Sequence, residues 1–364
     1  MYIFDVDYLL RAVRTIYFRG YTTAFLEDYT HFPNREIKKG TAQPWNIAKD
    51  YNSVEATPIL AKTHKELQTV AFLIIKNDSI WHESYFDGFN KDSKTNSFSM
   101  AKSVITAALG KAIMQGKIKN LDQKVTDFYP ELKGKYAKEV TVGDLSSMAS
   151  GLSWDEKYYS PFSIVTRAYF DDDLDKVILG LEINEKPGQS FKYLSGATQL
   201  LAMCIEKATG EYVSEYVSKN FFFFLGAEND ALWQLDHEPD GIEKAYCCIA
   251  SNARDFARFG KLYKQNGKWN GKQILDSTFV KKCITPRFKN SPEYGYGWWM
   301  HTIKGKDLFY MRGHLGQFVI VIPEDDLIIV RLGHLKGVQT TTDPHSNDLY
   351  TYVEEAYKML EKRN

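Results

Sequence analysis

Two groups of strand-forming residues, far apart in the chain, most constrain the fold. Residues 318–322 and 327–330 are almost continuously apolar and flank the turn at residues 323–326. Such strands are typical of a sheet that is covered on both faces. The second group is a hairpin pattern at residues 70–86, in which two strand-like runs enclose a short polar turn. We therefore expect strands from both ends of the chain to meet in one sheet with covering layers.

The chain between these groups is mainly helical in pattern. Apolar residues recur at helical spacing in residues 99–116, 196–209 and 251–265, and amphipathic helices are predicted over residues 5–19 and 346–361. The sequence thus predicts an α/β (α+β) fold, with an antiparallel sheet flanked by N- and C-terminal helices and an inserted, mostly helical domain. The expected parts are an N-terminal helix and irregular arm over residues 1–58, a sheet domain from residues 59–116 and 246–364, and a mostly helical domain over residues 117–245.

Composition narrows the classes of partner. The 364 residues include 46 Lys plus Arg and 46 Asp plus Glu, so the formal net charge is zero. No global basic field is available to hold a nucleic acid, which favours a small molecule as the partner. No run of 18 or more apolar residues occurs, so no membrane span is predicted, and the oligomeric state is left open.

The remaining compositional signals concern compartment and redox state. The N-terminus has no secretory signal as written, which predicts a cytoplasmic protein, or a periplasmic or secreted one if an upstream leader was removed. Four cysteines lack any disulfide or zinc-ligand spacing, and we expect buried free thiols at positions 204, 247, 248 and 283. Neither a metal nor an organic cofactor is expected.

The stretch Ser99-Met-Ala-Lys102 carries the first chemical signal. It lies where a loop gives way to the helix at 99–116, and side chains three residues apart are neighbours on one helical face. An amine can accept the proton of an adjacent hydroxyl, and a helix N-terminus favours the developing alkoxide. An N-terminal serine followed by a solvated lysine would give the same spacing, so the pair alone does not establish a nucleophile.

Two further segments complete a pattern. Tyr193-x-Ser195 follows the turn Lys186-Pro-Gly188, and His314-x-Gly316 lies between two predicted strands. In this order and separation, the three motifs resemble those of the serine β-lactamase and penicillin-binding-protein superfamily. The similarity is greatest to its class C branch, which includes family VIII-type esterases and 6-aminohexanoate-dimer hydrolases. It covers roughly residues 60–335.

The resemblance implies a serine hydrolase that works through an acyl-enzyme intermediate. It implies that Ser99 is the nucleophile, and that Lys102 and Tyr193 move its proton with lowered pKa values. The remaining assignments that it implies are an oxyanion hole from the backbone of Ser99 and Gln317, and substrate binding by Tyr158, Ser195, His314 and Gly316. Tyr193 as a core tyrosine, His314 as a strand-end histidine and Tyr158 (or Tyr159) as a surface aromatic are the competing interpretations.

Departures from the family pattern bear on the substrate. Ser195 stands where the lactamases have Asn, and His314 stands where they usually have Lys. The first change removes an amide that would hold the substrate, and the second removes a permanent cation that would bind a β-lactam carboxylate. We therefore expect esters or simple amides as substrates. A β-lactamase or D-alanyl-D-alanine peptidase, or a non-catalytic binding protein with this fold, is the alternative.

Overall fold

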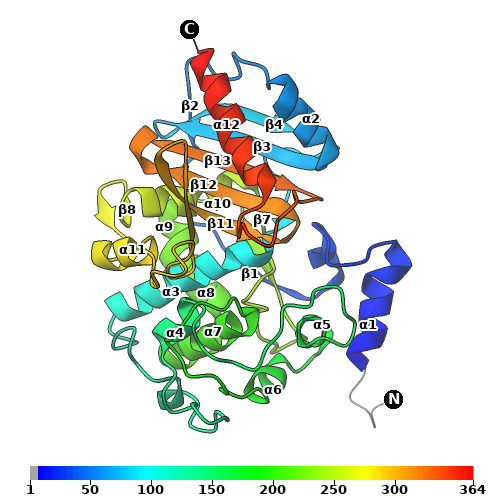
Figure 1. Ribbon diagram of the computed structural model, residues 1–364, viewed down its shortest axis with the longest axis vertical. Coiled ribbons are helices and arrows are strands. Elements are labelled where there is room, and N and C mark those ends of the chain that lie inside the picture. Colours follow the sequence, from blue (N-terminus) through cyan, green and yellow to red (C-terminus); the bar gives the residue numbers. More distant parts are fainter. Residues whose placement is uncertain (1–6, 364) are drawn as a thin grey trace.

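The computed structural model describes residues 7–363, and one large sheet organises them (Figure 1). Its seven strands follow the order β10-β11-β12-β13-β3-β4-β2, antiparallel throughout except where β2 joins β4 in parallel. The strands are β2 (Asn46–Ile47), β3 (Thr69–Lys76), β4 (Ser79–Tyr85), β10 (Trp299–Ile303), β11 (Lys306–Gly313), β12 (Gln317–Ile322) and β13 (Leu327–Gly333). The predicted meeting of the hairpin with the C-terminal strands is confirmed.

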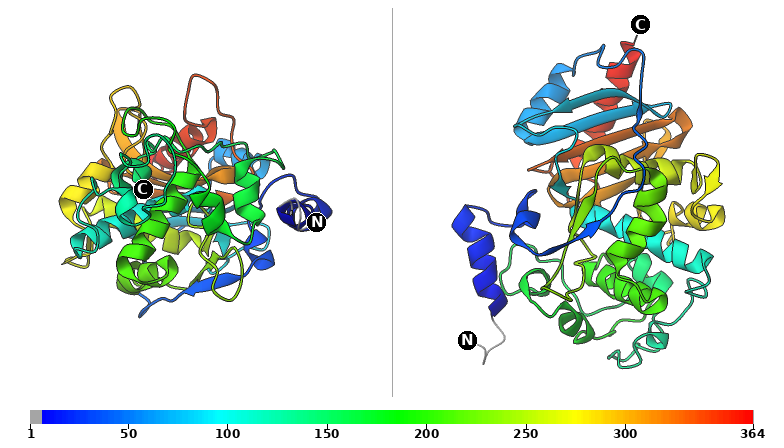
Figure 2. Two further views of the ribbon diagram at one scale, coloured as in Figure 1. Left: turned by 90° about the horizontal axis from the view of Figure 1, so that it is seen from below. Right: turned by 180° about the vertical axis from the view of Figure 1, so that it is seen from behind.

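Two layers of helices cover the sheet, as the apolar strands require. In β12, Phe318 and Ile320 face the helices α2 (Pro58–Glu66) and α12 (Asn347–Glu361), whereas Val319 faces α10 (Ala253–Lys264). Figure 1 shows α12 across the near face, and Figure 2 shows the opposite side. At Gly260 of α10, an added Cβ would lie 2.9 Å from Val319 and 3.0 Å from Val321, so this residue permits close packing of helix on sheet.

A second sheet lies beneath the first and was not predicted. It has the order β1-β6-β7-β5, and its strands are β1 (Asn34–Ile37), β5 (Thr95–Asn96), β6 (Ala231–Gln234) and β7 (Ile249–Ser251). Strand β1 of this sheet and β2 of the large sheet both fall in residues 1–58, the segment expected to hold a helix and an irregular arm. The strands of the second sheet are too short to show alternation of apolar and polar residues, which explains why the sequence pattern does not reveal this sheet. The other two-residue strands, β8 (Lys268–Trp269) and β9 (Lys272–Gln273), form a separate hairpin.

The remaining helices lie mostly between the two groups of strands in the sequence. They are α1 (Asp7–Thr15), α3 (Ala101–Met114), α4 (Val142–Ser146), α5 (Ile164–Phe170), α6 (Leu174–Leu179), α7 (Ser195–Thr209), α8 (Val213–Val217), α9 (Phe223–Leu225) and α11 (Ser277–Cys283). Of the predicted helix at 5–19, positions 5 and 6 lie outside the described residues, and a 3₁₀ turn replaces its end. Within residues 7–363, no helix is both long and apolar enough to cross a membrane.

Candidate active site

Ser99 lies in a tight turn that local hydrogen bonds define. The 3₁₀ turn Phe98–Met100 runs directly into α3, and Phe98 has a left-handed backbone with φ of 45°. A non-glycine residue in this conformation requires support from its surroundings. The side chain of Asn96 accepts a hydrogen bond from the Phe98 amide at 2.9 Å, and the Ser97 amide donates to the carbonyl of Ile249 at 2.7 Å. The turn is thus fixed from both the preceding strand and β7.

Lys102 contacts the Ser99 hydroxyl directly. Its Nζ lies 2.9 Å from Ser99 Oγ and donates to the Tyr246 carbonyl oxygen at 2.7 Å. The lysine side chain is almost completely buried. Burial disfavours the charged amine and lowers the pKa of Lys102 to about 7, while the negative charge of Glu156 acts in the opposite direction. A substantial fraction of the amine is therefore neutral near pH 7 and able to accept a proton.

Tyr193 lies near Lys102, two residues before the start of α7. Its ring centroid is 5.2 Å from Lys102 Nζ. Burial raises the pKa of Tyr193, and Glu156 raises it further; the interaction with Ser99 is a weaker opposing effect. The predicted lowering of this pKa is therefore wrong. The phenol is neutral, because the lowering effects of Ser99 and of the charge on Arg312 do not offset the loss of solvent.

The carboxylate of Glu156 is a site residue that sequence reasoning missed. Trp154 Nε1 donates to Glu156 Oε1 at 2.8 Å, and Ser195 Oγ donates to Oε2 at 3.1 Å. The amide of Ser195 and the hydroxyl of Tyr158 also donate to this carboxylate. Ser195 is therefore engaged with Glu156 through both its amide and its hydroxyl. The only sequence signal was a carboxylate two residues from both Trp154 and Tyr158, which by itself is unremarkable.

The turn after β11 is stabilised by hydrogen bonds from the buried Arg331. Leu315 and Gly316 have φ of 62° and 79°, and their carbonyl oxygens each accept a hydrogen bond from Arg331 at 2.9 Å. The Gln317 side chain donates to the carbonyls of His314 and Gly333 at 3.0 and 2.7 Å. Gly316 and Gln317 do not line the cavities beside Ser99 described below. Their hydrogen bonds stabilise the turn itself.

His314, in contrast, faces the region beside Ser99. Its ring stacks on Tyr158 with centroids 5.4 Å apart, and its Nε2 lies 3.3 Å from Thr23 Oγ1. Burial lowers the pKa of His314 to about 3, helped by the positive charge of Lys336. The histidine is therefore neutral at physiological pH, in agreement with the expectation that no permanent cation lies at this position.

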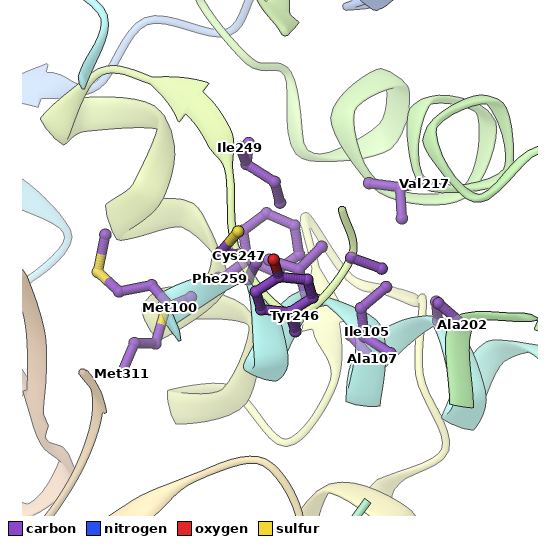
Figure 3. Close-up of a cluster of buried hydrophobic side chains, with 14 of the residues drawn as sticks. Met100, Ile105, Ala107, Ala202, Val217, Tyr246, Cys247, Ile249, Phe259 and Met311 are labelled. Carbon is purple, nitrogen blue, oxygen red and sulfur yellow. The ribbon is translucent and has the colours of Figure 1, made fainter. Parts of the chain in front are cut away.

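Tyr246 and Cys247 line a cavity beside Ser99. Figure 3 shows the Tyr246 ring among buried side chains from several elements, with Cys247 beside it. The structure joins Cys247 and Cys248 in a disulfide, so the prediction of free thiols is wrong for this pair. Cys248 has an unusual φ of 78°, which no sequence spacing signals. The other two cysteines, 204 and 283, are free and buried as predicted.

Two cavities adjoin Ser99. We name them the apolar and the polar cavity, because only the second has the side chains of Asp, Glu, Lys or Arg residues in its wall. The apolar cavity, of about 80 Å³, includes Ala12, Ile16, Phe98, Val165, Phe170 and Tyr246 in its wall. The polar cavity, of about 340 Å³, includes Glu156, Tyr193, Trp299, Arg312, Lys336 and Gln339. Ser99, Tyr158 and His314 line both. Of the neighbouring tryptophans, Trp298 is buried in the core and Trp299 lines the polar cavity. Residues 7–363 contain no group of three or more His, Cys, Asp or Glu suited to a metal ion.

Comparison with known proteins agrees with these features. The model of the Beta-lactamase family matches residues 58–349. A 6-aminohexanoate-dimer hydrolase from Paenarthrobacter ureafaciens is 26% identical over 298 residues, which cover 76% of this chain and 75% of the relative. A candidate 6-aminohexanoate-dimer hydrolase from Bacillus anthracis has a similar fold, with a TM-score of 0.71 at 22% identity, covering 98% of this chain and 95% of that one.

A D-amino acid amidase from Ochrobactrum anthropi SV3, solved with L-phenylalanine amide, also has this fold. Its TM-score is 0.62 at 17% identity, covering 82% of this chain and 96% of that one. At these identities the structural likenesses establish the fold only.

Proposed function

Because this chain belongs to the Beta-lactamase family and is a hydrolase, we propose that it cleaves an ester or amide bond of a small substrate through an acyl-enzyme intermediate on Ser99. The observation that carries the proposal is the pair formed by Ser99 and Lys102. The amine lies at hydrogen-bond distance from the hydroxyl, and its pKa is lowered to about 7. This combination activates a serine without a histidine base.

In the acylation step, Ser99 Oγ attacks the carbonyl carbon while its proton passes to the neutral amine of Lys102. The new bond joins Ser99 Oγ to the acyl carbon, and the bond from that carbon to the leaving oxygen or nitrogen breaks. Tyr193, a neutral phenol between the lysine and the polar cavity, relays the proton to the leaving group. In the second step, water attacks the acyl carbon, the bond from that carbon to Ser99 Oγ breaks, and one proton of the water passes to Ser99 Oγ as the carboxylic acid leaves.

The oxyanion hole is assigned to the backbone amides of Ser99 and Gln317 from the family resemblance and not from the cavity walls, because Ser99 lines both cavities and Gln317 lines neither. The turn that contains Gln317 is held by Arg331, and the turn that contains Ser99 is held by Asn96. Rigid donors of this kind lower the barrier by about 3–4 kcal/mol each, because they need no reorganisation as charge develops.

An ester or amide fits the site better than a β-lactam. His314 is neutral, so the family's usual cation is absent from this position. Ser195 is already bound to Glu156 and offers no amide to the substrate. The relatives support the amide as a substrate class, since one is named for a 6-aminohexanoate dimer and another for D-amino acid amides.

A fluorophosphonate probe tests the nucleophile. The wild-type protein should be labelled at Ser99, and Ser99→Ala should abolish the labelling. Ser103→Ala is the matched control, because Ser103 lies on α3 just after the turn that contains Ser99 and its hydroxyl donates to the Gly297 carbonyl instead. Persistent labelling of the Ser99→Ala protein would refute the assignment, and a wild-type protein that is folded but unlabelled would favour the non-catalytic alternative.

A further inference from the structure

A separate cavity lies between α1 and the chain that links β6 to β7, and we name it the basic cavity. Its volume is about 480 Å³. It shares only Phe170 with the wall of the apolar cavity and no residue with the wall of the polar cavity. Positive charge is in excess here, because the ionisable side chains in the wall, apart from two histidines, are Arg11, Arg14, Arg19, Lys244, Asp172 and Asp236.

The amine of Lys244 is a buried donor without an acceptor. The residue is 1% exposed, and its Nζ has neither a hydrogen bond nor an ion pair with any of residues 7–363. Its contacts are with aromatic rings, since Nζ lies 3.7 Å from the centroid of Phe32 and 5.1 Å from that of Tyr169. A buried ammonium whose three N–H groups lack an acceptor is costly. These donors are therefore available to a ligand in the basic cavity.

The two carboxylates near Lys244 are engaged with other groups. Asp236 accepts hydrogen bonds from three backbone amides and lies 3.1 Å from His237 Nδ1, and Asp28 accepts three hydrogen bonds from neutral side chains. Their charges raise the pKa of Lys244, but burial has the larger effect and lowers it to about 7, with a smaller contribution from Arg11. An anion in the cavity would stabilise the charged amine, because it would supply the acceptor that neither carboxylate provides.

Two arginines from the N-terminal part of the chain line the same cavity. Arg14 lies in the last turn of α1, and Arg19 lies in the 3₁₀ turn that follows. Both are exposed, and neither forms a hydrogen bond or an ion pair within the part of the chain that the structure describes. Arg11 differs from them, because it pairs with Asp172. The basic cavity thus brings together three cations without an ion pair, the two exposed arginines and the buried Lys244.

We propose that Lys244, Arg14 and Arg19 bind a phosphate group in the basic cavity, either free phosphate or the phosphate of a small molecule. A phosphate monoester carries a charge of about −1.5 to −2 near pH 7 and has three strong acceptor oxygens. Three separate cations match this group better than they match a carboxylate, which has two oxygens and one charge. Guanidinium groups are well suited to phosphate, and an ammonium adds a point charge.

The position of the cavity makes the ligand an effector and not a substrate. Figure 1 shows α1 at the edge of the molecule beside α5. This helix contributes Ala12 to the wall of the apolar cavity and Arg14 to that of the basic cavity. A phosphate bound to Arg14 and Lys244 would link α1 to the chain between β6 and β7 and so stabilise the wall of the apolar cavity. No chemistry at Ser99 is required, so the inference is independent of the function proposed above.

Calorimetric titration with sodium phosphate, at an ionic strength kept constant with chloride, tests the site. We expect saturable binding at one site per chain. Lys244→Met should weaken it by about tenfold or more, because a charge-assisted contact is lost. The double variant Arg14→Gln/Arg19→Gln should also weaken it; both residues are exposed, so this variant is expected to fold even if Lys244→Met does not. Phenyl phosphate distinguishes the sources: tighter binding than that of phosphate assigns a phosphorylated small molecule, and equal binding assigns free phosphate.

Two control variants locate the bound anion. Lys289→Gln removes a positive charge from an exposed residue outside the basic cavity and should leave phosphate binding unchanged. Arg312→Gln removes one from the polar cavity and should also leave it unchanged. Loss of binding in Arg312→Gln, with normal binding in Lys244→Met and in the double arginine variant Arg14→Gln/Arg19→Gln, would overturn the inference. Absence of saturable phosphate binding by the folded wild-type protein would overturn it as well.

Discussion

The pH dependence of Ser99 reactivity follows directly from the environment of Lys102. The pKa of the buried amine is lowered to about 7, and only the neutral amine accepts the serine proton. The rate of Ser99 acylation should therefore rise with pH and level off above pH 8. At pH 6 about a tenth of the amine is neutral, so the rate should be about a tenth of the plateau.

Fluorophosphonate labelling in the range pH 5–9 measures this profile without knowledge of the substrate. An exposed lysine, with its ordinary pKa of 10.5, would instead give a rate that rises about tenfold per pH unit beyond pH 9. Glu156→Gln removes the charge that raises the pKa of Lys102, so it should move the midpoint to lower pH. A flat profile between pH 6 and 8, or a midpoint near 10, would refute the assignment of Lys102 as the base.

The same amine links stability to pH. Its pKa is lower in the folded than in the unfolded protein, so the unfolded chain binds more protons between pH 7 and 10. The free energy of unfolding should therefore rise with pH across this window, by up to about 4 kcal/mol from this group alone. Comparison of wild type with Lys102→Met by urea denaturation at both pH values isolates the contribution. A difference between the two proteins that does not change with pH would contradict it.

Three further variants test other parts of the site and the core. Tyr193→Phe should lower kcat about 100-fold for an amide and less for an ester with a good leaving group, since the relay to the leaving group is lost. Arg331→Met should lower kcat/KM, measured on any cleaved ester, because Leu315 and Gly316 lose their hydrogen bonds. Gly260→Ala should destabilise the protein by about 1–3 kcal/mol in thermal unfolding, because its Cβ meets Val319 at 2.9 Å.

The central part of the large sheet was predictable because β3, β12 and β13 are long and almost wholly apolar, whereas β2 has only two residues and was not predicted. Phe318–Ile322 can only be buried, and its two faces require two layers of helices. The second sheet was not predictable in the same way. Its strands have two to four residues, and β1 and β6 pair across almost 200 positions of sequence, so no local pattern reports them.

At the site, sequence motifs identified Ser99, Lys102 and Tyr193, but they did not predict the direction in which the pKa of Tyr193 is shifted. The pKa of Lys102 is lowered as expected, whereas the pKa of Tyr193 is raised by the same physical cause, which is burial. Desolvation favours the neutral form of each group, which is the free amine for lysine and the phenol for tyrosine. Arg14 and Lys244 of the basic cavity could not be grouped from the sequence, since only the fold brings α1 beside the chain between β6 and β7.

The apolar cavity takes part of its wall from outside the region that contains the residues proposed for catalysis. Ala12, Ile16 and Thr23 contribute to its wall, and they precede the region from 58 to 349 that matches the family model. The groups proposed for catalysis all lie inside that region. An exchange at one of these N-terminal positions can thus reshape the cavity beside Ser99 while the contact between Lys102 and Ser99 is kept.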